Sequence, residues 1–277
     1  YKFTYDNLNR MKNAVYGEGT TISANAGRFS ENITGYDRNG NITSLQRYGK
    51  SSGTAYGIID NLTIAYTGNQ LKYANDAATD PLYNGAFNFV DGSNSTGNEY
   101  IFDRNGNLQQ DYNKKISKIQ YNQLNLPSTQ QFTNGNRADY LYGADGVKRR
   151  VTHKTAIANI SVPMGQIKEL TSGQVSQTHT TDYCGNVIYE NGIPVKLLTE
   201  AGYVTLADSK YHYFVQDHLG NNRVVVDQSG NVEEVNHYYP FGGLLSSSVS
   251  NAVQPYKYNG KELDRKNGLD WYDYGAR

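Results

Sequence analysis

The sequence predicts an all-β fold, in which successive hairpins lie side by side in one long twisted antiparallel sheet. Three observations predict this fold: a short aspartate-led turn that recurs along the chain, intervening segments rich in β-branched and aromatic residues, and no sustained 3.6-residue periodicity. Aliphatic residues are scarce, since the 277 residues include 25 tyrosines and the mean hydropathy is −0.70. We therefore expect tyrosine rings to pack on the sheet while their hydroxyls stay solvated.

The recurring turn consists of an aromatic residue, then Asp, Asn or Gly, two variable residues, and then Gly or Asn. Copies occupy Tyr5–Asn9, Tyr36–Gly40, Phe102–Gly106, Tyr121–Asn125 and Tyr142–Gly146, and related turns occupy Asp217–Asn221 and Asp227–Asn231. The copies that begin at residues 102, 121 and 142 are 19 and 21 residues apart. A unit of about 20 residues would give the chain about 14 units.

The spacing within the motif has a physical cause. An Asp at the first turn position accepts hydrogen bonds from backbone amides two or three residues on, and a Gly or Asn three places later tolerates the left-handed conformation that closes a type I turn with a bulge. The residues expected to build such turns are Tyr36, Asp37, Gly40, Asn41, Phe102, Asp103, Gly106, Asn107, Asp217, Gly220, Asn221, Asp227, Gly230 and Asn231.

The segments between the turns favour strands, and two stretches interrupt them. Predicted strands include Asn41–Tyr48, Lys118–Tyr121, Arg223–Val226 and Val232–Tyr239. Residues 75–98 are small and polar and predict a longer loop, while the serine-rich run Ser246–Asn251 predicts a flexible connection. Neither stretch divides the chain convincingly into domains.

Charge, cysteine content and motifs exclude several functional classes. The 26 Lys and Arg balance the 26 Asp and Glu, which excludes a general nucleic-acid-binding protein. The single cysteine, Cys184, excludes a disulfide scaffold and a cysteine-based zinc site. No stretch approaches the ~18 apolar residues that a membrane span needs. No nucleophile elbow, phosphate-binding loop or dinucleotide fingerprint is present, so no cofactor is expected.

Three groups of residues could carry chemistry, and each has a structural alternative. His212, His218 and His237 lie near Asp217 and Asp227, but they lack the tight spacing of metal ligands, so no metal is expected.

Asp264, Asp270 and Asp273 could act as paired carboxylates or could simply initiate turns. Cys184 has no assignable His partner and replaces Asp or Asn in a turn. The chain is therefore predicted not to be an enzyme.

The tyrosine-rich turns, and above all the last third of the chain, resemble the Rhs (rearrangement-hotspot) or YD-repeat family, in the style of bacterial polymorphic toxins. The stretches that carry the resemblance are Tyr213–Arg223, Tyr238–Gly242, Tyr256–Glu262 and Gly268–Arg277. On this basis we expect residues 1–210 to be degenerate repeats and residues 211–277 to be the start of a truncated Rhs-associated core. The opening Tyr1–Asp6 has no initiating Met or export signal, and the chain stops within its pattern, so we interpret it as part of a longer polypeptide.

The resemblance, which extends distantly to toxin-complex cocoons and teneurins, implies a sheet that spirals into a hollow shell around a C-terminal toxin or effector of the same polypeptide. The chain would then be a non-enzymatic wall segment of a secreted or bacterial cell-surface protein. In toxin members an Asp-Pro motif of the core supports self-cleavage. That motif would lie beyond Arg277, and Asp80-Pro81 lies outside the core context.

The same residues are also compatible with an alternative function. The chain could be a cell-surface adhesin or a glycan-binding repeat module, with a target-cell surface or glycans as its partner. Aromatic rows on a sheet can stack on sugar rings, but the placement of tyrosines beside the turns favours a structural role, in which they pair across strands.

Overall fold

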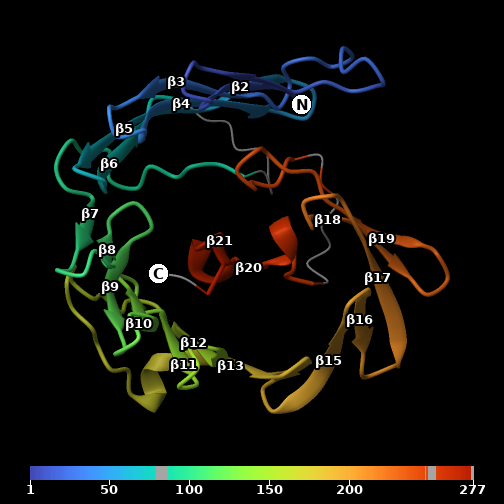
Figure 1. The fold of residues 1–277 in the computed structure, drawn as a ribbon. Coiled ribbons are helices and arrows are strands. Elements are labelled where there is room, and N and C mark those ends of the chain that lie inside the picture. Colours follow the sequence, from blue (N-terminus) through green and yellow to red (C-terminus); the bar gives the residue numbers. More distant parts are fainter. Residues whose placement is uncertain (79–86, 247, 249–253, 276–277) are drawn as a thin grey trace. The chain divides into compact units, whose positions relative to one another are not determined.

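The structure is a computed structural model, and it describes residues 1–78, 87–246, 248 and 254–275. It confirms the predicted all-β class: antiparallel strands dominate, and the helices among these residues are three single 3₁₀ turns (Figure 1). The chain forms two compact units, one of residues 1–100 with 236–249 and the other of residues 101–235 with 250–277. The Asp80-Pro81 dipeptide and most of the predicted flexible connection Ser246–Asn251 lie outside the described residues.

The first unit contains a six-stranded sheet in which every strand pairs with the next along the chain. Its strands are β1 (Lys2–Tyr5), β2 (Met11–Val15), β3 (Glu31–Tyr36), β4 (Ile42–Lys50), β5 (Tyr56–Thr67) and β6 (Gln70–Asp76). Consecutive antiparallel pairing is what short turns between strands permit, since no crossover connection is needed.

A thirteen-stranded sheet follows, with the same consecutive order. Its strands are β7 (Tyr100–Phe102), β8 (Leu108–Asp111), β9 (Ile116–Tyr121), β10 (Pro127–Phe132), β11 (Arg137–Tyr142), β12 (Lys148–Ala156), β13 (Val175–Cys184), β14 (Val187–Glu190), β15 (Ile193–Thr199), β16 (Gly202–Thr205), β17 (Lys210–Gln216), β18 (Asn222–Asp227) and β19 (Val232–Val235). The boundary predicted between residues 210 and 211 falls inside β17.

The last described residues form a small hairpin of β20 (Glu262–Asp264) and β21 (Trp271–Asp273). The 3₁₀ turns are η1 (Ser172–Gln174), η2 (Tyr258–Gly260) and η3 (Lys266–Gly268). In the part of the chain that the structure describes, no helix has the length and hydropathy to cross a membrane.

Two details differ from the sequence prediction. The strands belong to two large sheets rather than one, because the polar stretch between β6 and β7 contributes no strand among its described residues. The strand predicted over Val232–Tyr239 ends at Val235. Beyond it the chain reverses between Tyr239 and Gly242, where the Gly242 amide donates to the Tyr239 carbonyl at 2.9 Å, and a sharp reversal cannot continue a ladder.

Small apolar clusters, rather than one large core, hold each unit together. In the first unit Phe29 and Ile59 pack with two residues of the later segment, Tyr239 and Leu245. A second cluster there consists of Ile33, Leu45 and Leu62 from β3, β4 and β5. Aromatic rings supply much of the contact, as the scarcity of aliphatic residues requires, with the Phe29 ring edge-on to those of Tyr16 and Tyr56.

The second unit buries its terminal segment in the same way. Leu269 is 1% exposed and packs with Ile116, Ile119 and Phe132 of β9 and β10. Burying one such side chain stabilises the fold by about 1.5–3 kcal/mol. The segment that carries β20 and β21 is therefore part of the core of the second unit.

Candidate functional site

The aspartate-led turns are built by three hydrogen bonds to one carboxylate. At Asp37, Oδ1 accepts from the backbone amides of Asn39 at 2.9 Å and Asn41 at 2.8 Å, while Oδ2 accepts from the Asn41 side chain at 2.8 Å. Gly40 has a φ of +86°, the left-handed conformation that glycine adopts without strain. The donors lie two and four residues after the Asp, not two and three.

The same arrangement recurs in the second unit. Oδ2 of each Asp accepts from the side chain of the Asn four places on: 2.9 Å for Asp103 and Asn107, 2.8 Å for Asp217 and Asn221, and 2.8 Å for Asp227 and Asn231. The glycines three places after each Asp, Gly106, Gly220 and Gly230, have φ values of +81°, +77° and +84°.

The aromatic residue before the Asp37 turn makes contacts of its own. The Tyr36 hydroxyl donates to the Met11 carbonyl at 2.6 Å, and the Arg10 guanidinium lies 4.4 Å from the centre of the Tyr36 ring. Phe102 is the last residue of β7 and is half-buried. The Tyr36 ring therefore faces β2, the neighbouring strand of its own sheet.

These hydrogen bonds keep the turn carboxylates ionised. The side chain of Asn41 lowers the pKa of Asp37, and that of Asn231 lowers the pKa of Asp227. At Asp103 and Asp217 burial acts in the opposite direction, but the donors outweigh it and the pKa is again below its ordinary value. A carboxylate that accepts several N–H bonds stabilises the turn, and its lowered pKa makes it a poor general base.

Amide side chains also link neighbouring turns, which the sequence reasoning missed. The Asn125 side-chain oxygen accepts from Asn105 at 3.1 Å and from Asn107 at 3.2 Å. Asn69 plays the same part for Asn39 and Asn41, both at 3.1 Å. The signal that could have revealed the link is an Asn at both the second and fourth positions after the Asp.

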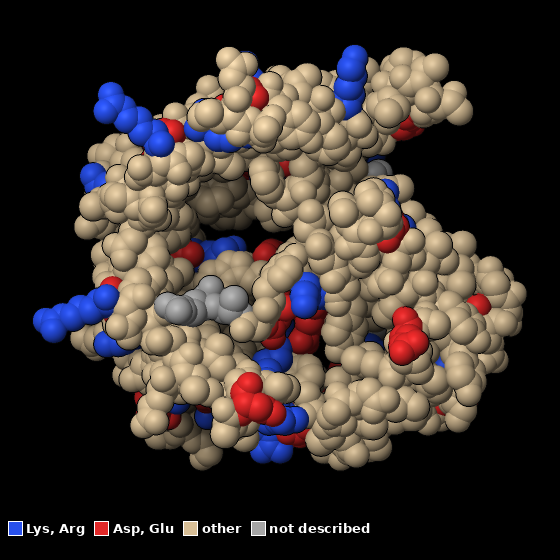
Figure 2. Space-filling view, in the orientation of Figure 1, with Lys and Arg blue, Asp and Glu red and all other residues tan. Residues whose placement is uncertain are grey.

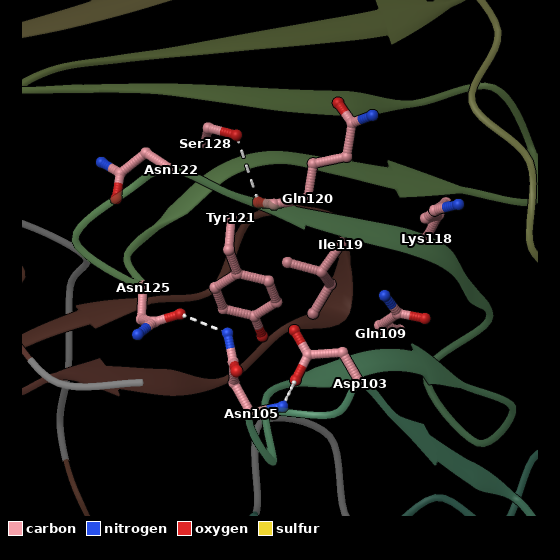
Figure 3. A pocket seen from close by; sticks show the side chains of 10 residues that line it. All are labelled: Asp103, Asn105, Gln109, Lys118, Ile119, Gln120, Tyr121, Asn122, Asn125 and Ser128. Carbon is pink, nitrogen blue, oxygen red and sulfur yellow. Dashed lines mark hydrogen bonds between the residues drawn. The ribbon is translucent and has the colours of Figure 1, made fainter.

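A polar cavity of about 530 Å³ lies between the turns that begin at Asp103 and Asn122 (Figure 3). Strands β8 and β9 are paired at Asp111 and Ile116, and toward the cavity Tyr121 bridges them by donating from its hydroxyl to the Leu108 carbonyl at 2.6 Å. Burial raises the pKa of Tyr121 to about 12, so the hydroxyl stays protonated as a donor. The cavity is lined by Asp103, Asn105, Gln109, Lys118, Ile119, Gln120, Tyr121, Asn122, Asn125 and Ser128.

A second cavity, of about 510 Å³, lies between the thirteen-stranded sheet and the segment that carries β20 and β21. Its charges are paired: Lys148 Nζ lies 2.9 Å from Glu262 and 2.6 Å from Asp273, and the Tyr183 hydroxyl donates to Glu262 at 2.8 Å. Lys148 and Glu262 are 114 residues apart, so sequence reasoning gave no signal for the pair. We interpret this cluster as an attachment point for the terminal segment.

The predicted carboxylate cluster is not brought together as one site. Asp273 pairs with Lys148, Asp270 pairs with Arg265 at 2.8 Å, and Asp264 lies 3.7 Å from His153. Burial lowers the pKa of His153 to about 3 and raises that of Asp264, so this contact is not an ion pair at neutral pH.

The remaining candidates also stand apart. His212 stacks on Tyr203 with ring centres 4.4 Å apart, and its Nδ1 lies 2.6 Å from Glu233. His218 is an exposed turn residue, and His237 belongs to the other unit. Over the described ranges, no three His, Cys, Asp or Glu side chains gather as metal ligands, and Cys184 is exposed.

Comparison with known proteins finds structural likeness over nearly the whole chain. No model of a known family matches. Salivary gland surface protein 1 of Aedes aegypti is 26% identical over 193 residues, covering 64% of this chain and 5% of that protein.

Solved toxin-complex structures share the fold. The TcdB2-TccC3-Cdc42 structure is 19% identical with a TM-score of 0.61, covering 99% of this chain and 13% of that chain. A Photorhabdus luminescens Tc holotoxin pore gives the same values. TcdB2-TccC3 is 18% identical with a TM-score of 0.60, covering 99% of this chain and 14% of that one. The chain thus spans a small part of these proteins, and at these identities the likeness establishes the fold.

Proposed function

We propose that the chain is a non-enzymatic wall segment of an Rhs or YD-repeat protein that encloses a C-terminal toxin or effector of the same polypeptide. The observation that carries the proposal is the match of 99% of the chain to toxin-complex structures at TM-scores of 0.60–0.61. The Rhs-like stretches of the sequence, Tyr213–Arg223 and Tyr256–Glu262 among them, support it. A secreted or surface-delivered protein is the setting that this function requires.

The wall would act by exclusion. Consecutive hairpins pair the backbone groups along each sheet and leave the turns as its rims, where each carboxylate is held by its own chain. Figure 2 shows Lys and Arg side chains interspersed with Asp and Glu on the face in view, with neither sign dominating. A near-neutral mixed surface can lie against a guest polypeptide without binding one sequence strongly.

Limited proteolysis of the native polypeptide that contains this chain tests enclosure. We expect the segment that follows the Rhs-like region to resist a protease that cleaves it rapidly once it is separated. Gly202→Ala should abolish the protection, because Gly202 has a φ of +153° and an added Cβ would lie 2.0 Å from the His212 carbonyl oxygen, between β16 and β17. Gly192→Ala is the matched control, since Gly192 also has a positive φ (+82°) but has no atom within 4 Å of an added Cβ.

Two results would contradict enclosure. One is cleavage of the following segment at the same rate in the native and separated forms. The other is protection that survives Gly202→Ala although the variant has lost the β16–β17 pairing, as measured by hydrogen exchange.

A surface adhesin is the second candidate, because the matched mosquito protein is named a surface protein. An adhesin would display exposed aromatic side chains, and Tyr211 and Tyr213 of β17 are 51% and 42% exposed, with rings 6.5 Å apart. Cell-binding by the native polypeptide that is lost in Tyr211→Ala/Tyr213→Ala, with no enclosed tail, would favour this function over the wall.

A further inference from the structure

Seven Asn-Gly pairs occur along the chain, and such a pair can modify itself without an enzyme. The main-chain nitrogen after an Asn can attack the carbon of the side-chain amide, and a glycine hinders this attack least because it has no Cβ. Six of the pairs lie in the described residues, and Asn84-Gly85 lies outside them. The six are Asn39-Gly40, Asn105-Gly106, Asn134-Gly135, Asn191-Gly192, Asn259-Gly260 and Asn267-Gly268.

Turn hydrogen bonds hold the glycine amide in five of these six pairs. Each of the five amides donates to the carbonyl three residues before it, at 3.0–3.3 Å, and the acceptors belong to Asp37, Asp103, Phe132, Lys257 and Arg265. The attacking nitrogen must lose its proton and turn toward the Asn side chain, so each of these bonds opposes the reaction. Gly192 is the exception, because no group among the described residues accepts from its amide.

The turn at Asn191 and Gly192 has a different geometry from the others. These two residues form the loop between Glu190 and Ile193, which face each other across β14 and β15, and their φ values are +50° and +82°. Two positive φ values define a type I′ turn. Rotation of its central peptide alone gives a type II′ turn, in which ψ of the first residue is about −120°.

That rotation has two consequences for the reaction. It directs the Gly192 nitrogen toward the side-chain carbon of Asn191, because at this ψ the nitrogen and Cβ lie on the same side of the main chain. It also breaks no hydrogen bond between described residues, since neither the Asn191 carbonyl nor the Gly192 amide takes part in one. The reactive conformation is therefore more accessible here than in the other five turns.

The Asn191 side chain is also held in a suitable position. Its Oδ1 accepts from the backbone amide of Thr180 at 2.9 Å, and its own backbone amide donates to the Thr180 carbonyl at 2.8 Å. Negative charge develops on Oδ1 as the nitrogen attacks, and the Thr180 amide stabilises that charge. Asn191 and Gly192 are both exposed, so water reaches the turn and can accept the proton.

We propose that Asn191 is a site of spontaneous deamidation. The Gly192 nitrogen loses its proton to water and bonds to Cγ of Asn191, the bond from Cγ to the side-chain nitrogen breaks, and ammonia leaves. A five-membered succinimide remains, and water opens it at either carbonyl to give aspartate or isoaspartate at position 191. The net reaction consumes one water molecule and releases one ammonia molecule, with no oxidant or cofactor.

The isoaspartate product changes the hairpin that carries it. Isoaspartate adds one methylene group to the main chain, and a loop of two residues sets the register of the strands that it joins. The pairing of β14 with β15 should therefore loosen where isoaspartate forms. Ile188 and Glu190 of β14 line the second cavity, so the change would reach the surface that faces the terminal segment.

The test compares deamidation of the full 277-residue chain in native buffer and in guanidinium chloride, at mildly alkaline pH, by peptide mapping with mass spectrometry. At each pair the ratio of the native to the unfolded rate removes the effect of the neighbouring sequence. We expect this ratio to be about two- to tenfold higher at Asn191 than at the other five described pairs, which is the factor that one hydrogen bond supplies. Hydrogen exchange in β14 and β15 should become faster as isoaspartate accumulates.

Asn191→Gly is the matched control, because Gly-Gly also forms a type I′ turn and has no side-chain amide. It should leave the other five rates unchanged and remove the time-dependent change in β14 and β15. The proposal is overturned if another of the five pairs has a ratio equal to that of Asn191. It is also overturned if the native chain leaves Asn191 intact while the unfolded chain converts it. Neither result bears on the protease test of enclosure.

Discussion

Each unit holds a cation between two carboxylates, yet the two clusters differ in which segment supplies the acids. In the first unit Arg47 of β4 lies between Glu31 of β3 and Asp60 of β5, which the sheet register places directly opposite it. In the second unit Lys148 of β12 pairs with two acids, Glu262 and Asp273. These two acids face each other in the β20–β21 hairpin.

The difference determines what each cluster stabilises. Both carboxylates that pair with Arg47 belong to the six-stranded sheet, and among the described residues of the later segment the Tyr239 ring lies 5.3 Å from the guanidinium. Lys148 loses both of its carboxylates when the terminal hairpin leaves the sheet. The Arg47 cluster therefore stabilises a sheet, and the Lys148 cluster fastens a segment to one.

The largest effect is expected from Arg47→Ala. Glu31 and Asp60 are fully buried, so removal of the guanidinium leaves uncompensated acids in the core and should cost about 3–5 kcal/mol of unfolding free energy in the first unit. Urea denaturation followed by hydrogen exchange in β3–β5 measures it. A loss of less than 1 kcal/mol would show that the cluster does not carry the stability assigned to it.

Lys148→Ala should have a smaller and more local effect. Glu262 and Asp273 are 22% and 37% exposed, so they can be hydrated again when the hairpin loosens, and we expect a cost of about 1–2 kcal/mol. Faster trypsin cleavage at Lys257 and Arg265, with β3–β5 unchanged, is the expected signature. Equal destabilisation of both units would contradict the comparison.

A pair of matched turn variants tests whether the two sheets lose the same amount of unfolding free energy. Gly40→Val and Gly106→Val place a β-branched residue at φ values of +86° and +81°, and each should cost about 1 kcal/mol or more. Each loss should appear in the unit that holds the turn, as measured by residue-resolved hydrogen exchange. Unchanged melting in both variants would remove the turn assignment.

Lowering the pH should affect the stability of the two clusters in opposite directions. Although burial opposes it, Lys148 lowers the pKa of Asp273, so its contribution is present above about pH 3.9, the unfolded value, and is lost as the pH falls through the folded pKa. Burial raises the pKa of Asp60, so its protonation in the folded state begins at higher pH and favours folding there. Hydrogen exchange should therefore show β20–β21 loosening first below about pH 4. In Asp273→Asn this acid-dependent step should disappear.

The sequence predicted the features that a few neighbouring residues determine, such as the turns. The positions of Asp37, Gly40 and Asn41 contain the whole turn, because donor and acceptor are four residues apart. Arg47 gave no such signal, since its partners depend on the register of β3, β4 and β5. Lys148 was still less predictable, because its partners lie on a hairpin more than a hundred residues away. The division into two sheets depends likewise on where pairing stops, which composition alone does not determine.

The late segment of the first unit has a consequence for biosynthesis. Strands β1–β6 are consecutive, so they can pair as they leave the ribosome, but Tyr239 and Leu245, which complete the cluster around Phe29 and Ile59, are translated only after the whole thirteen-stranded sheet. Until then the nascent sheet exposes an apolar surface to solvent, which makes it a substrate for chaperones. A chain that ended before residue 236 would thus contain the six-stranded sheet without Tyr239 and Leu245, and its apolar cluster would be incomplete.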